Sequence, residues 1–485
     1  MLRVGGSYGR GIPSMVRQIS GTAVVMAAKK PAAKAGAKGG KPKMTGKTKS
    51  SFAPQKQQTK VKKGGMTHYS FGDAVRELKF EKLAKTVPVD TLDVSKLSTL
   101  KGSVVKYTPS ILSKMNTLNV FKKFQHHELF ETPISLISEN CHKLNQTFIE
   151  KLNSNGSHNN RICLIGEKGI GKSTLLAQTI ALASSKYGDD IILLHVDKPE
   201  NIGNGTSDYI FNESLGKYQQ PMFTKRWIWK LKQVNEPIFK KLKLSQDITF
   251  QANRVDHHLK KDINSIYDFL QANLDFGKYA PTEAFQFLVK ELIHHSKNVP
   301  IMVSIDNVNG IVDNAITEYK TPSFKPIHVT DFEMGDFFIK LMSGELKFDK
   351  GGILMAQTKD FGEFLTTLDV SLGIKQYDPY ARSKFFDLAI ANRLLSNGGV
   401  KPFHVENLTK DESKNLLQFY KDQGVLQVRD YAQKPSTKSL RQESQLNLTG
   451  NEFDSDEQFK KLINSHFTVS SGNPGYLLKA TVLNY

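Results

Sequence analysis

The chain has 485 residues, of which 67 are Lys or Arg and 47 are Asp or Glu, giving a formal net charge of +20. With 39% apolar and 24% charged residues, its composition predicts a mainly globular protein of two or three domains with a large core. No run approaches the length of about eighteen apolar residues that spans a membrane, so membrane insertion is not expected, and the 2 cysteines exclude a disulfide framework.

Positive charge is concentrated at the start of the chain. Residues 1–72 contain fifteen Lys and Arg and no Asp or Glu, whereas the remaining 413 residues carry 52 basic and 47 acidic side chains. Residues 1–27, with three Arg among small and hydroxylated residues, resemble a mitochondrial targeting sequence in composition, which predicts a location in the matrix; a generic disordered tail is the alternative. Residues 28–72 are rich in Lys, Gly, Ala and Pro, which predicts a disordered basic arm that binds phosphate backbones or only solubilises the chain.

The rest of the chain predicts an α/β protein. Residues 73–135 are expected to form an N-terminal extension of helical pieces and loops, and residues 136–152 one amphipathic helix. From residue 161 β-rich runs alternate with helical patterns, which predicts a parallel sheet flanked by helices within a domain at residues 136–405. Five strands are expected, at residues 162–165, 191–196, 301–305, 353–356 and 403–405.

Between the second and third strands lies an insertion at about residues 200–280. It contains the only tryptophans, Trp227 and Trp229, which could stack on RNA bases, although local packing is the favoured interpretation. Pro281 suits the first turn of a helix that leads into the third strand. Residues 406–485 predict a helical C-terminal segment, in which Thr409 and Glu412 have the spacing of a capping box.

Residues 166–173 read GEKGIGKS, the phosphate-loop pattern of two glycines followed by Lys-Ser. The pattern lies between a predicted strand and a predicted amphipathic helix, so its backbone N–H groups are expected to form an anion nest at the helix N-terminus. Lys172 is expected to reach the β- and γ-phosphates and the Ser173 hydroxyl to bind Mg²⁺. The predicted nucleotide-binding residues are Gly166, Glu167, Lys168, Gly169, Ile170, Gly171, Lys172, Ser173 and Thr174.

A second Mg²⁺ site residue is expected where a central strand ends, and Asp306 follows the apolar run 301–305. The alternative is that Asp306 only caps the following turn. Many ATPases of this class carry a Glu directly after this Asp, but here the residue is Asn307. An amide orients water but does not accept its proton, and general-base assistance is typically worth about 10²–10⁴ in rate. We therefore expect tight nucleotide binding with slow or no hydrolysis.

Other polar residues add less to the predicted site. Gln357 and Thr358 follow the fourth strand, where a γ-phosphate sensor would lie, and with Asn307 they are the candidate sensors. No Asn-Lys-x-Asp guanine signature is present, so the residues alone do not identify the base and ATP is not excluded. The histidine pairs at residues 126–127, 257–258 and 294–295 lack a third metal ligand and are expected on solvated helix faces.

Several segments together resemble the death-associated-protein-three family, the GTP-binding subunit of the mitochondrial ribosome's small subunit, in its fungal form. The resemblance covers about residues 115–485. It is carried by residues 166–173, 196–209, 303–309, 402–408 with Phe419 and Tyr420, and 471–478, the last of which is similar to the Asn-Pro turn that opens the family's closing helix.

The resemblance implies a P-loop NTPase core related to the AAA+ class, with a helical C-terminal lid at residues 406–485. It implies GTP or GDP with Mg²⁺ as ligand, and it implies contacts with mitochondrial small-subunit rRNA, neighbouring ribosomal proteins and the large subunit at the intersubunit face. The family often has Gly after the Mg²⁺-site Asp. Asn307 departs from that pattern but likewise supplies no catalytic Glu. The insertion at residues 200–280 matches poorly.

Three functions are compatible with these observations. The main hypothesis is a structural ribosomal protein in which the nucleotide is a folding ligand. The alternative is an active mitochondrial AAA+-like NTPase that acts on nucleic acid, although residue 307 is not a carboxylate and no arginine stands out as a finger. A weaker third possibility is a switch in which Asp306 and Thr358 sense the γ-phosphate and move the lid.

Overall fold

Five parallel strands form the centre of the computed structural model, which describes residues 88–252, 255–273, 276, 280–359, 366–380, 386–426 and 455–483. In the order in which they lie side by side, the strands are β14 (Lys401–His404), β4 (Arg161–Ile165), β13 (Gly351–Ala356), β10 (Ile301–Asp306) and β5 (Ile192–Val196). Each of the five predicted strands is confirmed to within two residues. Four of the five are buried along their whole length, as expected of parallel strands covered on both faces.

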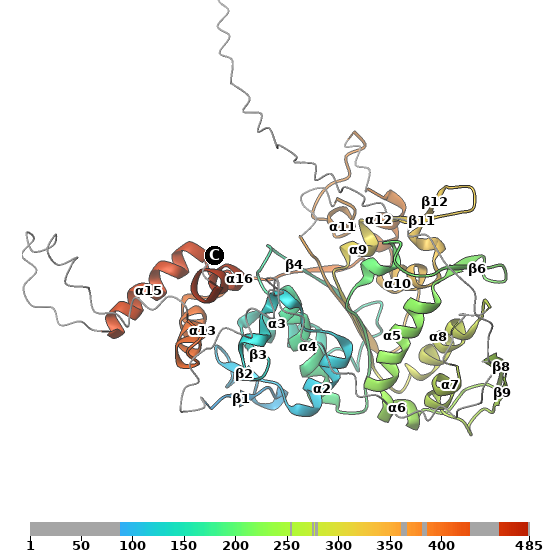
Figure 1. Cartoon of the computed structure of the whole chain (residues 1–485), viewed down its shortest axis with the longest axis horizontal. Coiled ribbons are helices and arrows are strands. Elements are labelled where there is room, and N and C mark those ends of the chain that lie inside the picture. Colours follow the sequence, from blue (N-terminus) through green and yellow to red (C-terminus); the bar gives the residue numbers. More distant parts are fainter. Residues whose placement is uncertain are drawn as a thin grey trace, which may run out of the picture. The chain divides into compact units, whose positions relative to one another are not determined.

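Helices cover the sheet on both sides. Helices α3 (Glu139–Leu144) and α4 (Lys172–Tyr187) lie on one side, and α8 (Ala284–His295) and α10 (Glu333–Ser343) lie on the other (Figure 1). Further helices in the described part of the core are α2 (Pro109–Leu118), α9 (Asn309–Val312), α11 (Thr366–Ser371) and α12 (Leu388–Leu395). The chain divides into two units, residues 1–67 and 68–485, and every described residue belongs to the second.

The N-terminal extension differs from its prediction. It contains a small sheet of β1 (Asp90–Thr91), β2 (Val104–Lys106) and β3 (Ile134–Leu136) as well as helices. Because residues 134–136 pair with β2, the helix predicted over residues 136–152 begins three residues later than expected: α3 begins at Glu139 and continues directly into a π-helical turn, Asn145–Ile149. The predicted targeting sequence, the basic arm and residues 73–87 lie outside the described residues.

The predicted start of the helix before the third strand is also wrong. Helix α8 begins at Ala284, three residues after Pro281, with Glu283 at its N-cap position. The Thr282 hydroxyl accepts a hydrogen bond from the Ala284 N–H at 3.0 Å and so satisfies the first free amide of the helix. Pro281, which was expected in the first helical turn, lies before the helix begins.

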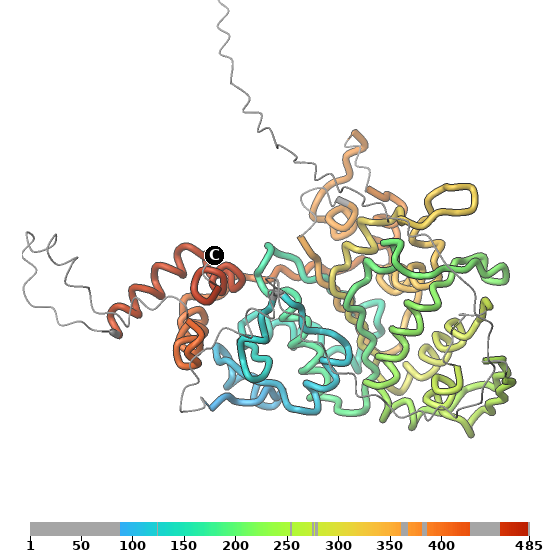
Figure 2. Tube along the Cα trace, in the orientation of Figure 1, coloured from blue at the N-terminus to red at the C-terminus, as the bar shows by residue number. Residues whose placement is uncertain are grey.

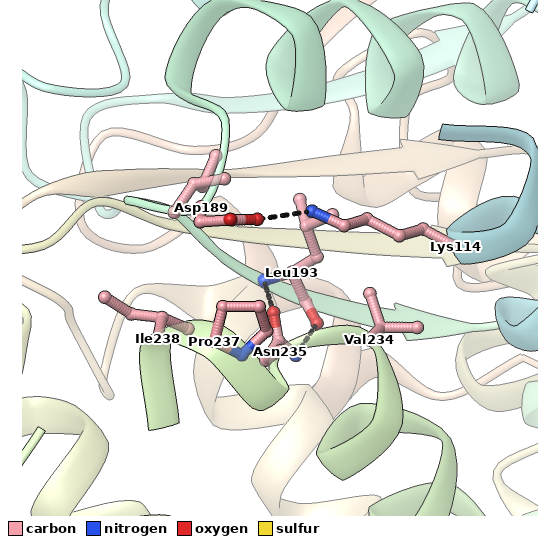
Figure 3. A pocket seen from close by; sticks show the side chains of 8 residues that line it. Lys114, Asp189, Leu193, Val234, Asn235, Pro237 and Ile238 are labelled. Atoms are coloured by element: carbon pink, nitrogen blue, oxygen red, sulfur yellow. Dashed lines mark hydrogen bonds and ion pairs between the residues drawn. The ribbon is translucent and has the colours of Figure 1, made fainter. Parts of the chain in front are cut away.

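The edge of the sheet at β5 is closed by a side chain from the insertion. Asn235, directly after α5 (Pro221–Val234), accepts a hydrogen bond from Leu193 N at 2.8 Å and donates one to Leu193 O at 2.9 Å (Figure 3). Lys114 and Asp189 form an ion pair of 3.0 Å beside it. Because the Asn235 amide satisfies backbone groups that an edge strand would otherwise expose, it protects β5 from pairing with another chain.

The described residues of the insertion at residues 200–280 are folded and pack on the core. Its remaining described elements are β6 (Ile210–Asn212), β7 (Lys217–Gln219), α6 (Glu236–Lys241), β8 (Ile248–Ala252), β9 (Val255–Leu259) and α7 (Ile266–Ala272). Trp227 is only 4% exposed, contacts the rings of Phe285 and Phe338, and donates a hydrogen bond to His195 O at 2.8 Å. The packing interpretation is therefore confirmed for Trp227, whereas Trp229 is 52% exposed.

Glu333, at the start of α10, fastens the insertion to the core. Its buried carboxylate accepts hydrogen bonds from Gln219 at 2.9 Å and from Gln286 at 3.1 Å. Burial raises the pKa of Glu333 to about 7 from 4.5, and the two amide hydrogen bonds oppose part of this rise. Between these pH values the folded protein holds a proton that the unfolded chain has released, so the free energy of unfolding falls as the pH rises.

We expect the substitution Glu333→Gln to remove this pH dependence. The Glu333 contribution is complete below about pH 4.5 and is lost as the pH rises through 7, whereas Gln does not ionise. The variant should therefore gain stability relative to the parent between pH 5 and 8, by roughly 1.4 kcal/mol for each unit of pKa shift. Urea denaturation at several pH values measures this difference, and a stability difference that does not change with pH would contradict it.

The C-terminal residues form a second apolar cluster. Helices α13 (Lys410–Asp422), α15 (Ser455–Ser470) and α16 (Pro474–Leu478), with the π-helical turn Lys479–Leu483, bury Leu416, Leu417, Phe419, Tyr420, Phe459, Ile463 and Leu477. The predicted capping box is confirmed, because Thr409 Oγ1 accepts from Glu412 N at 3.2 Å and Glu412 Oε2 from Thr409 N at 2.8 Å. Helix α13 packs beside β2 although the two are distant in sequence, and Asn415 Nδ2 donates to Gly102 O at 2.9 Å (Figure 2).

Candidate nucleotide site

The loop between β4 and α4 has the backbone conformation that its sequence predicts. Gly166, Gly169 and Gly171 have φ angles of 151°, 81° and 99°, which residues with a Cβ rarely adopt. The loop ends at the N-terminus of α4, a helix of 16 residues, so its free N–H groups and the positive end of the helix dipole face the same space. This geometry binds an anion such as a phosphate group.

Two side chains of the first helical turn point into this loop and toward the sheet. Lys172 is buried, and its Nζ donates hydrogen bonds to the carbonyl oxygens of Gly166 at 2.9 Å and Glu167 at 2.6 Å. Ser173 Oγ donates to Asp306 Oδ1 at 3.0 Å. The predicted Mg²⁺-site residues, Ser173 and Asp306, are therefore brought together although 133 positions separate them in the chain.

Asp306 ends β10 and is only 2% exposed. Its other oxygen, Oδ2, forms an ion pair with Lys122 Nζ at 3.0 Å. Nearby, Asp197 follows β5 and pairs with Lys230 at 2.9 Å. Burial raises the pKa of Asp197, but the hydrogen bond and charge of Lys230 outweigh it, so its pKa is lower than usual. The carboxyl end of the sheet thus carries two carboxylates, each with a lysine partner.

Asn307 has a left-handed φ of 61°, and its amide is hydrogen-bonded to Glu200. Asn307 Nδ2 donates to Glu200 Oε2 at 3.1 Å, and the short helix Pro199–Ile202 that carries Glu200 packs closely on α9. A Cβ on Gly310 would lie 2.8 Å from Glu200 N, so glycine is required for this approach. The fold therefore brings the Glu200 carboxylate next to Asn307, where the sequence itself has an amide in place of a carboxylate.

Gln357 and Thr358 lie between the loop and Asp306. Ala356, the residue before them, pairs with Leu164 on one side and with Asp306 on the other, and Gln357 N donates to Leu164 O at 2.9 Å. The Gln357 amide donates to Asp369 at 3.2 Å, and Thr358 N donates to Asn309 Oδ1 at 2.8 Å. Their backbone position fits that of a sensor, and their role as sensors stays a prediction.

The C-terminal segment touches the outer turn of the loop. Asn473 Nδ2 donates to Lys168 O at 3.0 Å, and Gly475 N donates to Gly169 O at 3.0 Å. A Cβ on Gly475 would lie 2.8 Å from Gly169 Cα, so the two segments are in backbone contact. The predicted Asn-Pro turn is confirmed, with Asn473 as the N-cap of α16, but its contact with the loop was not predicted.

Sequence reasoning found the loop and Asp306 but missed four neighbouring residues, Lys122, Gln125, Glu200 and Asn473. Gln125 Nε2 donates to the hydroxyl of Thr174, a predicted nucleotide-binding residue, at 3.3 Å. The four residues come from three distant segments, and none of them belongs to the phosphate-loop pattern at residues 166–173. Only the Asn-Pro turn gave a signal in the sequence, because it belongs to the family resemblance.

The histidine pairs are placed differently from their prediction. His126 lies between two short 3₁₀ helices and His127 begins the second, where burial lowers the pKa of His127 to about 4, and His257 and His258 lie on β9. Only His294 and His295 end a helix. In the described part of the chain, no three His, Cys, Asp or Glu side chains form a group that could hold a metal ion. Cys141 and Cys163 are buried thiols.

Comparison with known proteins identifies the family of this chain. A family model described as mitochondrial ribosomal death-associated protein 3 matches residues 135–480. The chain belongs to this family. The resemblance noted from the sequence is thereby confirmed, and membership of a family of mitochondrial ribosomal proteins agrees with the predicted mitochondrial location. Within the described ranges, no helix combines the length and apolar composition needed to cross a membrane.

Two curated relatives carry the name small ribosomal subunit protein mS29. The protein of Schizosaccharomyces pombe is 26% identical over 323 residues, which cover 66% of this chain and 64% of the relative. The protein of Neurospora crassa is 24% identical over 348 residues, covering 68% of this chain and 69% of the relative. The match thus spans slightly less than two thirds of the first relative's length.

Proposed function

We propose that this protein is a structural component of the small ribosomal subunit in the mitochondrial matrix and binds a guanine nucleotide with Mg²⁺ as a structural ligand. Its family description and the names of two relatives support the ribosomal role. The single observation that carries the ligand proposal is the phosphate loop joined through Ser173 to buried Asp306, with an amide at residue 307. Guanine is proposed from the family resemblance alone, and ATP is the competing ligand.

The strand order supports a P-loop NTPase core related to the AAA+ class. Strand β13 lies between the strand of the phosphate loop and the strand of Asp306, so the residues after β13 face the space between loop and carboxylate. Open α/β sheets bind their ligands at this carboxyl edge. Helices α13, α15 and α16 would form the lid, and α16 contacts the loop through its N-cap residue Asn473 and through Gly475.

The residues present fit a magnesium ion. A hydroxyl and a buried carboxylate are oxygen donors of the kind that Mg²⁺ prefers, and they lie 3.0 Å apart at the N-terminus of α4. Among the described residues, the buried Asn307 Oδ1 has no hydrogen-bond donor. When bound, the ion would neutralise phosphate charge. Ser173 and Asp306 would hold it, Asp306 partly through water.

Many ATPases of this class have a Glu directly after the Mg²⁺-site Asp, and this Glu accepts the proton of the attacking water. In this chain the corresponding residue is Asn307, whose amide does not accept a proton. Asn307 donates its amide hydrogen to Glu200 and so is oriented by that carboxylate. Loss of a general base typically costs about 10²–10⁴ in rate. A ligand that stays bound without being cleaved stabilises the folded state by mass action. This is the behaviour of a structural ligand.

The proposed partners are mitochondrial small-subunit rRNA, neighbouring ribosomal proteins and, at the intersubunit face, the large subunit. The fifteen basic residues within residues 1–72 support an RNA contact, because Lys and Arg bind phosphate backbones by releasing counterions. Sedimentation of mitochondrial extract on a sucrose gradient at moderate salt tests this proposal. The chain should co-migrate with the small subunit, and its fractions should contain a guanine nucleotide. Migration as free, ring-sized oligomers would contradict the ribosomal role.

One observation favours the alternative of an active NTPase. Glu200 lies 3.1 Å from the Asn307 amide, so a carboxylate is present near the place where attacking water is activated in related enzymes. If Glu200 acts as a base, Glu200→Gln should lower a measurable nucleotide hydrolysis rate by about 10²–10⁴. On the structural-ligand account, hydrolysis by the parent chain is slow with or without RNA, and the variant hydrolyses nucleotide at the same slow rate. A radiolabelled-phosphate release assay distinguishes the two.

A further inference from the structure

The negative charge of Asp306 is already paired with a lysine that no phosphate-loop pattern includes. Asp306 Oδ1 accepts from Ser173 at 3.0 Å, and Oδ2 pairs with Lys122 Nζ at 3.0 Å. A buried carboxylate without a counter-charge is strongly destabilising, so the ammonium group compensates much of the cost of burying Asp306. Lys122 Nζ also donates to Asp197 O, which holds it at the carboxyl end of β5.

The turn that carries Lys122 is fixed to the proposed site. Lys122 precedes the 3₁₀ turn Lys123–Gln125, and its backbone N–H donates to Gln125 Oε1 at 3.0 Å. The Gln125 amide in turn donates to Thr174 Oγ1 at 3.3 Å, in the first turn of α4. These hydrogen bonds fix the position of Lys122 beside Asp306. It also lies outside residues 135–480, the part of the chain that the family model matches.

We propose that Lys122 is a positioning residue that shares Asp306 with Mg²⁺ and thereby makes nucleotide binding only weakly dependent on Mg²⁺. This inference rests on the proposed function. Asp306 paired with Lys122 attracts a divalent cation less strongly than an unpaired carboxylate would, because the ammonium charge repels the ion at short range. At the same time, the Lys122 charge adds to that of Lys172 near the space for the phosphates, so it replaces part of the attraction that Mg²⁺ would provide.

The test compares the Mg²⁺ dependence of GDP binding in matched variants. Calorimetric titration with GDP is carried out on the full chain in Mg²⁺ and in EDTA, for the parent and for Lys122→Met. We expect the ratio of the Kd in EDTA to the Kd in Mg²⁺ to be larger in the variant by about 5- to 150-fold, the usual range for coupled sites. Lys114→Met, which breaks the ion pair with exposed Asp189, is the control and should keep the parent's ratio.

Two further variants keep the test decisive. Lys122→Arg retains the charge and should retain the parent's ratio. Lys122→Gln removes the charge but keeps a hydrogen-bond donor, and it replaces Lys122→Met if that variant does not fold. Equal ratios in the parent and the uncharged variants would overturn the role of Lys122 while leaving the proposed nucleotide site intact. Failure of the parent to bind GDP, GTP or ATP would instead overturn the proposed function and this inference with it.

Discussion

Lys172→Ala is expected to abolish nucleotide binding and to lower the melting temperature of the purified chain. The Lys172 ammonium group is buried under the loop, where it bonds the carbonyl oxygens of Gly166 and Glu167 and faces the space for the phosphates. A ligand present at a thousand times its Kd stabilises the native state by about 4 kcal/mol. That is a large part of the 5–15 kcal/mol that is typical of the total stability of a domain.

The control for this variant lies on the same helix. Lys186 is exposed in the last turn of α4, where its ammonium group lies over the neighbouring Tyr187 ring, so Lys186→Ala should bind nucleotide normally. Differential scanning calorimetry with and without added GDP measures both proteins. On the structural-ligand account the added nucleotide raises the melting temperature of the control but not of Lys172→Ala. An equal rise in both variants would show that the loop lysine does not hold the ligand.

Arg161→Met is expected to destabilise the fold by at least about 3 kcal/mol, independently of nucleotide. Arg161 begins the strand of the phosphate loop and is only 1% exposed. Its guanidinium donates to the carbonyl oxygens of His158 at 2.8 Å, Met342 at 2.8 Å and Asn397 at 2.5 Å. Met342 lies in the last turn of α10, and Asn397 lies two residues beyond the end of α12, so one cation binds near the negative ends of two helices.

Methionine preserves much of the apolar volume of Arg161 but leaves these carbonyl oxygens without their donor. Each unsatisfied buried group typically costs about 1–3 kcal/mol. Arg393→Met is the matched control, because Arg393 pairs with Glu345 at the partly exposed surface of α12, and such pairs contribute about 1 kcal/mol or less. Urea denaturation of the two variants measures the difference. Equal stabilities would contradict the role of Arg161 in joining the helix ends to β4.

The strands and the phosphate loop were predictable because their signals are local. Each core strand is a continuous apolar run, and the loop is set by glycines at positions where φ is positive. Asp306 was predictable because a carboxylate that follows a buried strand falls at the ligand-binding edge of the sheet. The capping box of Thr409 and Glu412 was likewise contained within four consecutive residues.

The errors arose where distant contacts override local patterns. Residues 134–136 pair with β2, so the helix predicted from residue 136 begins only at Glu139. Lys122, Glu200 and Asn473 reach the site from separate segments, and each acts through contacts that only the folded chain creates. No spacing rule relates Lys122 to Asp306, because their positions are 184 residues apart and are joined by the packing of a turn against the sheet.

The nucleotide content of the purified chain is the most direct test of the central claim. The full-length protein is isolated in its folded form, denatured, and its released small molecules are separated and quantified. The account predicts about one guanine nucleotide for each chain of the parent protein and none for Lys172→Ala. A folded parent chain that releases no nucleotide, and that also fails to bind GDP, GTP or ATP when these are added, would contradict the account.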